Sequence, residues 1–196
     1  MAASQSRSRS HSQSGFEACN ILDDFDRVED PLSDGGAWSM ETTGVPDNIA
    51  ADGSTAVLAG ATETYAWRLW PAVCSDDVSV QADFVNATSA QCYLMARASA
   101  ASTDDCYIVL NKAFGPGNDL VLYSRNGGIG TLIGSYATGG TFTIKLECIG
   151  TTIKVYADGI ERISVVDTDH AATNYVGFGL TGNVGITVDN FIAAEA

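Results

Sequence analysis

Residues 141–166, TFTIKLECIGTTIKVYADGIERISVV, decide the fold. Between residues 142 and 148 every second side chain is apolar, which is the pattern of a strand with one face in a core and one in water. The alternation stops at Gly150 and resumes over residues 153–157. We therefore predict a β-hairpin whose turn contains this glycine.

A second turn signal follows at Asp158-Gly159, a pair typical of tight β-hairpins. Ile163, Val165 and Val166 then continue the pattern as a third strand. Three antiparallel strands cannot shield their apolar face alone, because a single sheet leaves that face in water. We therefore expect the remaining chain to supply a second layer.

Composition and charge exclude several classes of function. The chain has 196 residues, with 20 glycines and 4 prolines, and it is long enough for one large all-β domain. Its formal net charge is −14, which argues against binding to nucleic acid or to anionic membrane surfaces. No apolar run approaches the roughly 20 residues of a membrane-spanning helix.

Short segments with strand character recur at intervals of about ten residues, as in all-β sandwiches and barrels. They occupy residues 20–27, 55–59, 62–70, 78–85, 91–98, 105–110, 120–124, 129–136, 174–181 and 185–192. Residues 91–98 contain good helix formers, but eight residues between two turn signals favour a strand. Residues 41–53 are predicted to be irregular, and Asn126-Gly127-Gly128 to form a hairpin turn.

The N-terminal residues 1–19 are interpreted as an extended arm, and residues 20–196 as the sandwich domain. The arm is Ser-rich and contains Arg7, Arg9 and His11. Such a composition does not fold by itself, so two interpretations stay open: the arm docks on a partner chain, such as an acidic groove of a neighbouring copy, or it is an untethered tail. No apolar stretch follows the arginines, so we do not expect a secretory signal and expect synthesis in the host cytoplasm.

Five cysteines occur without the CxxC spacing of a zinc site. Cys92, Cys106 and Cys148 alternate with core residues and are predicted to be buried, reduced thiols. Cys19 and Cys74 lie near the ends of segments, so they are the candidates for exposed thiols and for a bridge to a neighbouring chain.

Several motifs in this order resemble those of the concanavalin A-like lectin and glucanase superfamily, in particular its laminin-G-like and phage-associated members. The matching stretches are Asp24-Phe25-Asp26-Arg27 with Trp38, residues 93–98, residues 107–109 leading into 122–125, residues 142–159, residues 176–178 and residues 188–191. The resemblance implies a jelly-roll sandwich of two curved antiparallel sheets, with the first and last strands adjacent.

The resemblance also implies where catalytic carboxylates would lie. Glucanases of the superfamily place two glutamates and an aspartate on one strand, and this chain has no Glu-x-Asp-x-Glu. Gln81-Ala82-Asp83 keeps one carboxylate, which cannot serve as both acid and nucleophile. His170 is interpreted as a solvated loop histidine, because no Gly-x-Ser-x-Gly accompanies it. We do not expect an enzyme.

Two kinds of binding site are candidates. Asp167 and Asp169 could supply oxygen ligands to calcium, as in several laminin-G-like modules, although loop aspartates more often form turns. Arg68, Trp70 and Tyr123 could form a carbohydrate-binding platform on a concave face, although aromatic residues in sandwiches more often belong to the core.

Two functions from different classes follow. The first is a structural component of a phage virion, a capsid-decoration or tail-associated protein that forms homo-oligomers and docks on other chains of the assembly. The second is a lectin-like module that recognises a cell-surface glycan.

Overall fold

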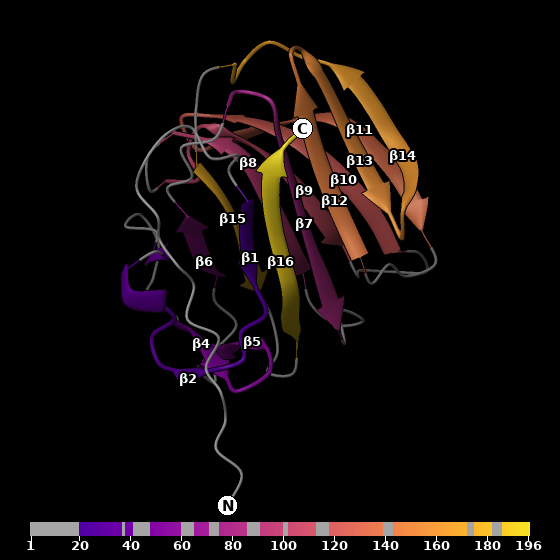
Figure 1. Ribbon diagram of the computed structural model, residues 1–196. Coiled ribbons are helices and arrows are strands. Elements are labelled where there is room, and N and C mark those ends of the chain that lie inside the picture. Colours follow the sequence, from indigo (N-terminus) through magenta and orange to yellow (C-terminus); the bar gives the residue numbers. More distant parts are fainter. Residues whose placement is uncertain are drawn as a thin grey trace, which may run out of the picture.

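The computed structural model is an all-β sandwich (Figure 1). It describes residues 20–36, 38–40, 48–59, 65–70, 75–85, 91–99, 102–112, 118–138, 143–171, 175–181 and 186–196. The arm predicted for residues 1–19 lies outside these residues, and so do Cys19 and Cys74.

The first layer is a nine-stranded sheet in the order β14-β13-β12-β7-β16-β5-β4-β2, with β1 also paired to β16. Its strands are β1 (Asn20–Asp23), β2 (Val28–Glu29), β4 (Asn48–Asp52), β5 (Ala56–Ala59), β7 (Val78–Val85), β12 (Thr143–Ile149), β13 (Thr152–Ala157), β14 (Ile160–Val166) and β16 (Thr187–Glu195). Every pairing is antiparallel.

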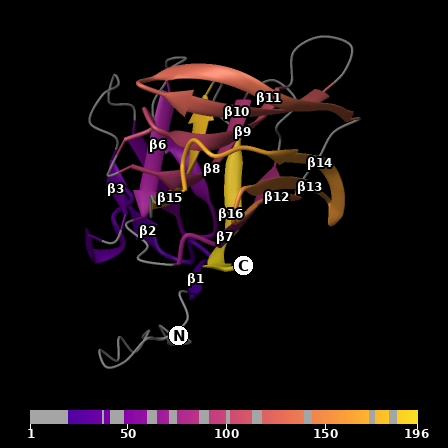
Figure 2. The same cartoon turned by 90° about the horizontal axis from the view of Figure 1, so that it is seen from above.

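The second layer is a seven-stranded antiparallel sheet in the order β11-β10-β9-β8-β15-β6-β3. Its strands are β3 (Ser39–Met40), β6 (Tyr65–Trp70), β8 (Gln91–Ala98), β9 (Cys106–Lys112), β10 (Asn118–Asn126), β11 (Ile129–Thr138) and β15 (Tyr175–Thr181). Figure 2 shows the two sheets as two layers, and the predicted two-sheet sandwich is confirmed.

The segment that decides the fold forms the predicted hairpins. Cys148 lies opposite Ile153 across the first turn, where Gly150 adopts φ +53°. At the second turn Asp158 and Gly159 both have positive φ, 48° and 77°, as a type I′ turn requires. β12 also pairs with β7, which joins this meander to the rest of its sheet.

The first and last strands of the described chain meet in the middle of the nine-stranded sheet. One edge of β16 pairs first with β5, at Val188 and Ala56, and then with β1, at Ile192 and Leu22. The other edge pairs with β7 along a register that contains a bulge at Asn190, whose φ is +50°. The first and last strands are therefore adjacent, as the resemblance implied.

A continuous apolar core fills the space between the sheets. In β7 buried and half-buried residues alternate strictly, because one face of the strand packs inward and the other faces out. At one end of the core Phe25, Trp38, Phe178 and Phe191 form an aromatic cluster with ring centroids 4.9–6.4 Å apart. Such tilted and edge-to-face packing adds to the free energy gained by burial.

Two predicted segments differ from the structure. β1 ends at Asp23 instead of continuing to residue 27, because Phe25 takes φ +51° and turns the chain. Residues 48–52, predicted to be irregular, form β4. Pairing with β5 and burial of Ala50 and Ala51 stabilise this strand, and neither effect is visible in the local sequence.

The three predicted core thiols are confirmed. Cys92, Cys106 and Cys148 are buried thiols that form no disulfide, and Cys92 lies opposite Asn111 in the register of β8 and β9. Burial raises the pKa of the Cys92 and Cys148 thiols to about 12, so both stay protonated at neutral pH.

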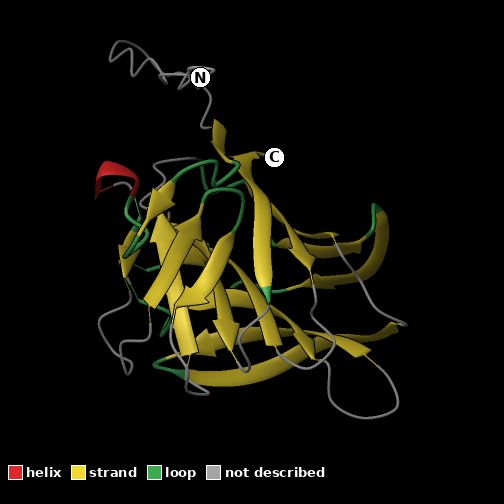
Figure 3. Cartoon of the chain, turned by 90° about the horizontal axis from the view of Figure 1, so that it is seen from below, coloured by secondary structure: helices red, strands yellow, loops and turns green. Residues whose placement is uncertain are grey.

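Helix contributes almost nothing to the described chain, as Figure 3 shows. The 3-10 turn Asp34–Gly36 follows β2. Within the described ranges no helix has the length and apolar character needed to span a membrane.

Candidate functional site

In the seven-stranded sheet, the neighbouring strands β8, β9 and β10 carry buried apolar side chains on both faces. Its inner face belongs to the core, and its outer face carries a second apolar cluster, on which the half-buried Tyr123 and Tyr175 pack. This cluster consists of Tyr93, Met95, Ala98, Cys106, Ile108, Leu110 and Val121. We call the cluster and the two tyrosines the outer face. A sheet face that looks away from the core is usually polar in antiparallel sandwiches. The seven residues of the cluster are buried, so Tyr123 and Tyr175 are the side chains through which this face can reach a ligand, and they mark it as a candidate binding surface.

The strand register explains how Tyr123 sits on the outer face. Ile108 lies opposite Tyr123 on one side, and Leu132 lies opposite it on the other. A Cβ atom added at Gly130 would be 3.3 Å from Cδ1 of Tyr123, so this glycine lets the ring lie close to the backbone of β11. The ring is therefore held on an apolar bed and remains partly exposed.

Tyr175 occupies the first position of β15, opposite Ala98. Further along β15 the residues at outward register positions are Gly177, opposite Met95, and Gly179, opposite Tyr93. Since glycine has no side chain, β15 presents only backbone to the outer face there. Three inter-strand spacings separate β15 from β10, so Tyr175 and Tyr123 lie on strands roughly 14 Å apart.

Polar groups lie at both ends of the outer face, measured along its strands. At one end the Tyr93 hydroxyl donates a hydrogen bond to Oε1 of Gln91. At the other end Arg125 donates to the Gly128 carbonyl at 2.9 Å and to Oγ1 of Thr103 at 3.4 Å. The outer face thus combines aromatic rings on an apolar bed with hydrogen-bonding groups at its rim, which is the composition of a site for a small polar ligand with apolar faces.

The structure places the three residues predicted for carbohydrate binding only in part. Tyr123 lies on the outer face. Arg68 and Trp70 belong to β6, where the backbone pairs them with Phe178 and Val176 of β15. Their side chains are outside the described part of the chain, so the grouping of these three residues stays a prediction.

Asp167 and Asp169, the predicted calcium ligands, hold a loop against the second layer. Asp167 accepts a hydrogen bond of 2.6 Å from the Tyr107 hydroxyl. Asp169 accepts from Oγ of Ser124 at 2.8 Å and from Nδ2 of Asn126 at 2.9 Å. Across the described residues no group of three or more His, Cys, Asp or Glu side chains is arranged to hold a metal ion. This geometry gives the predicted calcium site no support.

His170 differs from its prediction as a solvated loop residue, because it is only 4% exposed. Its Nε2 lies 3.2 Å from Oγ of Ser124, and its ring packs edge-on against Tyr107 at 4.9 Å. Burial lowers the pKa of His170, and the carboxylates of Asp169, Asp105 and Asp167 oppose that shift. The partners of His170 are 46 and 63 residues away in sequence, so no local pattern indicated its burial.

The Ser124–His170 contact is not a hydrolytic triad. Ser124 is fully buried, and its hydroxyl donates to Asp169. In a triad the carboxylate instead orients the histidine, and the serine faces the substrate. This cluster therefore fixes the loop and leaves no accessible nucleophile.

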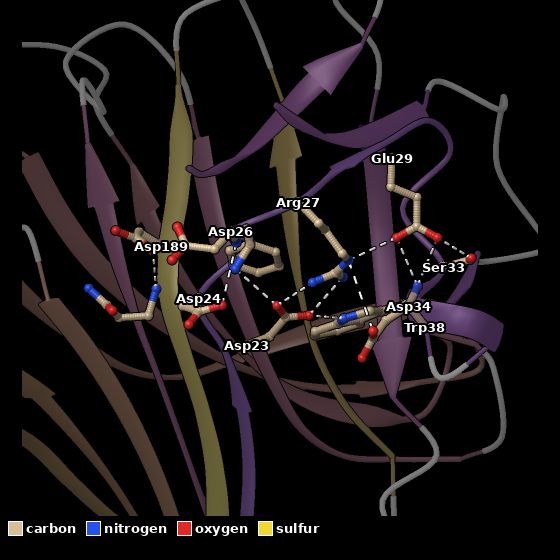
Figure 4. Close-up of polar contacts among 11 residues, drawn as sticks. Asp23, Asp24, Asp26, Arg27, Glu29, Ser33, Asp34, Trp38 and Asp189 are labelled. Atoms are coloured by element: carbon tan, nitrogen blue, oxygen red, sulfur yellow. Dashed lines mark hydrogen bonds and ion pairs between the residues drawn. The ribbon is translucent and has the colours of Figure 1, made fainter. Parts of the chain in front are cut away.

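A second polar network ties the turn after β1 to the aromatic cluster (Figure 4). Asp23 is fully buried, and its carboxylate accepts from Nη1 of Arg27 at 2.7 Å, from Nη2 at 3.0 Å, from Nε1 of Trp38 at 2.7 Å and from the Phe25 amide at 3.0 Å. Burial opposes ionisation, but these hydrogen bonds and the Arg27 charge hold the pKa of Asp23 below its ordinary value. A carboxylate with four donors is structural, because no acceptor capacity is left for a ligand.

The same network continues through Glu29 (Figure 4). Glu29 accepts from Nε of Arg27 at 3.0 Å, from the Asp34 amide and from the Ser33 hydroxyl. Partial burial disfavours its charge, but these donors lower the pKa of Glu29 to about 2. Together with Asp23, the motif residues Asp24 to Arg27 and Trp38 thus position a turn.

An acidic group lies next to this network, on the outer side of the nine-stranded sheet. Asp189 lies opposite Asp83 in the register of β16 and β7. Burial raises the pKa of Asp189, and the negative charges of Asp83, Asp26 and Asp24 raise it further. Asp83 accepts from Oγ1 of Thr143 at 2.6 Å and from Nδ2 of Asn190 at 3.0 Å.

No protein-family model matches the sequence, and no curated protein matches it. Solved structures do match the fold. The carbohydrate-binding module CBM66 from Bacillus subtilis has a TM-score of 0.58 at 16% identity and covers 81% of this chain and 95% of its own. The potassium-bound carbohydrate recognition domain of Emp46p has a TM-score of 0.63 at 11% identity, with 89% and 96% covered. A Bacillus subtilis protein of unknown function with a galectin-like fold has a TM-score of 0.65 at 14% identity, with 89% and 98% covered.

The fold is a lectin-like jelly roll. The matches cover nearly the whole of each of these modules, so the sandwich corresponds to a complete unit of that architecture. Of the three tyrosines on the outer face, the sequence singled out Tyr123 and not Tyr93 or Tyr175, and a binding role for Tyr123 stays a prediction. Strands β8 and β15 are buried on both faces, so alternation alone did not reveal which of their residues look outward.

Proposed function

We propose that this chain is a non-enzymatic carbohydrate-binding module that takes a glycan on the outer face of its seven-stranded sheet. The observation that carries the proposal is the position of Tyr123 and Tyr175, half-buried on an apolar bed that faces away from the core. Among the proteins with this fold, one is named as a carbohydrate-binding module and another as a carbohydrate recognition domain, which supports the same class of ligand.

Sugar rings have an apolar face and a rim of hydroxyl groups. An aromatic ring that is held flat and half exposed binds the apolar face, and amide, hydroxyl and guanidinium groups at the border bind the hydroxyls. The outer face provides both kinds of group, since Gln91 and Arg125 lie at opposite ends of its rows. A rigid bed also lowers the entropy lost on binding.

Hydrolysis of the glycan is not part of the proposal. Retaining hydrolysis needs two carboxyl groups about 5 Å apart, one acting as acid and one as nucleophile. Asp83 and Asp189 are the described carboxylates that lie opposite each other, but they belong to the nine-stranded sheet and not to the outer face. Release of reducing ends from any bound glycan by the purified protein would contradict a purely binding role.

The test is a glycan array followed by calorimetric titration of the best ligand. Tyr123→Ala and Tyr175→Ala are expected to weaken binding about tenfold or more, because each removes a stacking surface worth roughly 1–2 kcal/mol. Tyr156→Ala is the matched control, since Tyr156 is also half-buried but belongs to β13 of the other sheet. An array without ligands, or equal affinity in all three variants, would overturn the proposal.

The virion role inferred from the sequence stays a prediction. The glycan proposal is preferred because the outer face and the carbohydrate-binding neighbours both support it. Calcium binding through Asp167 and Asp169 also stays a prediction, and titration of the apo protein with calcium tests it.

A further inference from the structure

Asn126-Gly127 joins β10 to its hairpin turn and is the single Asn-Gly pair in the sequence. Asn126 is the last residue of β10, pairs with Ile129 of β11 and is exposed. Gly127 and Gly128 follow with φ +57° and +79°. An asparagine before glycine loses its side-chain amide more readily than any other, because glycine has no side chain to hinder attack by its backbone nitrogen. The pair is therefore a candidate site of chemical modification.

This modification needs no reactant other than water. The backbone nitrogen of Gly127 loses its proton and attacks Cγ of Asn126, so that a C–N bond forms and Nδ2 leaves as ammonia after taking up a proton. The product is a cyclic succinimide. Water then adds to either of the two carbonyl carbons of the ring and opens it, which leaves aspartate or isoaspartate at position 126. Water is consumed, ammonia is released, and no atom changes its oxidation state.

Two carboxylates hold the reacting atoms of this pair. Oδ1 of Asp105 accepts a hydrogen bond of 2.8 Å from the Gly127 amide, which is the nitrogen that would attack. Oδ2 of Asp169 accepts a hydrogen bond of 2.9 Å from Nδ2 of Asn126, which is the group that would leave. The nucleophile and the leaving group are therefore both engaged in the folded protein.

The charges of these carboxylates oppose the reaction. Loss of the Gly127 proton would leave a negative nitrogen beside Asp105, and attack on Cγ would place negative charge on the side-chain amide that is bonded to Asp169. Like charges at hydrogen-bond distance disfavour both steps. The strand adds a geometric restraint, because pairing with Ile129 keeps Asn126 extended and ring closure needs rotation of its backbone.

We propose that Asn126 is a latent deamidation site, which Asp105 and Asp169 keep unreacted while the end of the β10–β11 hairpin is closed. Reaction then requires a local opening that separates Gly127 from Asp105 and Asn126 from Asp169. Heat or mild denaturant, which increases such opening, turns the site on. The sequence supplies a reactive pair, and the fold sets how fast it reacts.

Conversion of Asn126 would release the loop that follows β14. Asp169 of this loop accepts hydrogen bonds from Asn126 and from the Ser124 hydroxyl. A carboxylate at position 126 removes a donor and places two negative groups within the space of one hydrogen bond, so the loop is repelled. His170 lies in the same loop, buried against Ser124, and becomes accessible when the loop moves. Since hydrolysis does not restore the amide, the change is one-way.

Peptide mapping by mass spectrometry tests the protection, with the full chain incubated at mildly alkaline pH with and without urea. The folded wild type is expected to deamidate at Asn126 at least about tenfold more slowly than the chain in urea, because reaction waits for opening. In the folded state Asp105→Ala and Asp169→Ala should each raise this rate about tenfold, since each removes a hydrogen bond to a charged group.

Asp77→Ala is the matched control. Asp77 also accepts a hydrogen bond from a turn glycine, the Gly150 amide at 2.6 Å, but in a different hairpin. Its variant is expected to leave the Asn126 rate within about twofold, after circular dichroism and thermal unfolding have shown that each variant is folded. Equal rates for the wild type in the folded state and in urea would overturn the proposal. So would folded Asp105→Ala and Asp169→Ala variants that both react as slowly as the wild type.

The release of the loop is tested separately by hydrogen exchange over residues 167–171. Asn126→Asp reproduces the charge of the product, and Asn126→Ala removes the donor without adding charge. Exchange is expected to be at least about threefold faster in Asn126→Asp than in Asn126→Ala. Equal exchange in the two variants would overturn the one-way change. Neither measurement uses a glycan, so these results stand apart from the proposed function.

Discussion

Arg97 and Gly150 connect the two layers of the sandwich directly. Nη1 of Arg97, at the end of β8, donates a hydrogen bond of 2.8 Å to the carbonyl of Gly150 in the turn between β12 and β13. Nε of the same guanidinium donates to the Asp76 carbonyl at 2.7 Å. The side chain is 1% exposed, and its backbone φ of +51° belongs to a bulge opposite β15. A buried cation thus fastens the hairpin that decides the fold to the opposite sheet.

Replacing Arg97 is expected to be costly. Arg97→Ala removes the donor to the Gly150 and Asp76 carbonyls and opens a cavity where a fully buried side chain stood, so we expect a loss of about 2–5 kcal/mol in the free energy of unfolding. Arg97→Lys should recover only part of the loss, because one ammonium cannot reproduce the fork of a guanidinium. Urea titration measures both variants. A loss under about 1 kcal/mol for Arg97→Ala would show that the contact contributes little.

Asp23 is expected to make the fold sensitive to acid. Its folded-state pKa lies below the ordinary value, so its contribution is fully present above the unfolded-state pKa and is lost as the pH falls through the folded-state value. Asp23→Asn should destabilise the protein by about 3 kcal/mol at pH 7, and the difference should shrink below about pH 4. Urea titrations from pH 7 to pH 3 measure it. Asp24→Asn, at an exposed neighbouring position, should change little, and a constant difference at all pH values would contradict the argument.

The Asn111 side chain is expected to lower the free energy of unfolding. Its side chain is fully buried on β9, and neither Nδ2 nor Oδ1 has a hydrogen-bond partner. A buried unsatisfied amide costs roughly 1–3 kcal/mol, so Asn111→Leu, which has a similar branched shape, should raise the free energy of unfolding by about 1 kcal/mol. Thermal unfolding measures the gain. Asn111→Ala is the control for packing, and a loss of stability in Asn111→Leu would indicate a function for the amide.

Gly130 is expected to influence glycan affinity through Tyr123. Gly130→Ala puts a Cβ atom 3.3 Å from Cδ1 of the ring and 3.7 Å from Cγ, so the ring must move by a few tenths of an ångström. If the glycan binds at the proposed site, this shift of the Tyr123 ring should weaken glycan binding about threefold to tenfold, with little change in the free energy of unfolding. Calorimetric titration checks this against Thr131→Ala, an exposed neighbour on the same strand. Unchanged affinity in Gly130→Ala would remove Tyr123 from the site.

The sequence predicts features that depend on strand alternation and turn chemistry. The alternation of apolar and polar residues over 142–157 predicted the register that places Cys148 opposite Ile153. The pair Asp158-Gly159 predicted the next turn, between β13 and β14. β4 escaped prediction because the pairing with β5 that stabilises it is not encoded in its own residues. Of the outer face, the sequence pointed to Tyr123 alone. A strand such as β8, which is apolar on both sides, gives no sign of which side faces outward.

His170 is expected to titrate below its ordinary range. Burial favours the neutral imidazole, so the folded-state pKa lies below 6.5 even though Asp169, Asp105 and Asp167 oppose the shift. The unfolded chain binds a proton near pH 6.5, so stability from this residue is fully present above that pH and decreases as the pH falls below it. The wild type should therefore lose more stability than His170→Gln between pH 6.5 and pH 5. NMR titration of the ring protons gives the pKa directly, and the spectrum of His170→Gln distinguishes its signals from those of His11, the other of the 2 histidines. A pKa above 6.5 would mean that the three carboxylates outweigh burial, and the loop would then gain stability in mild acid.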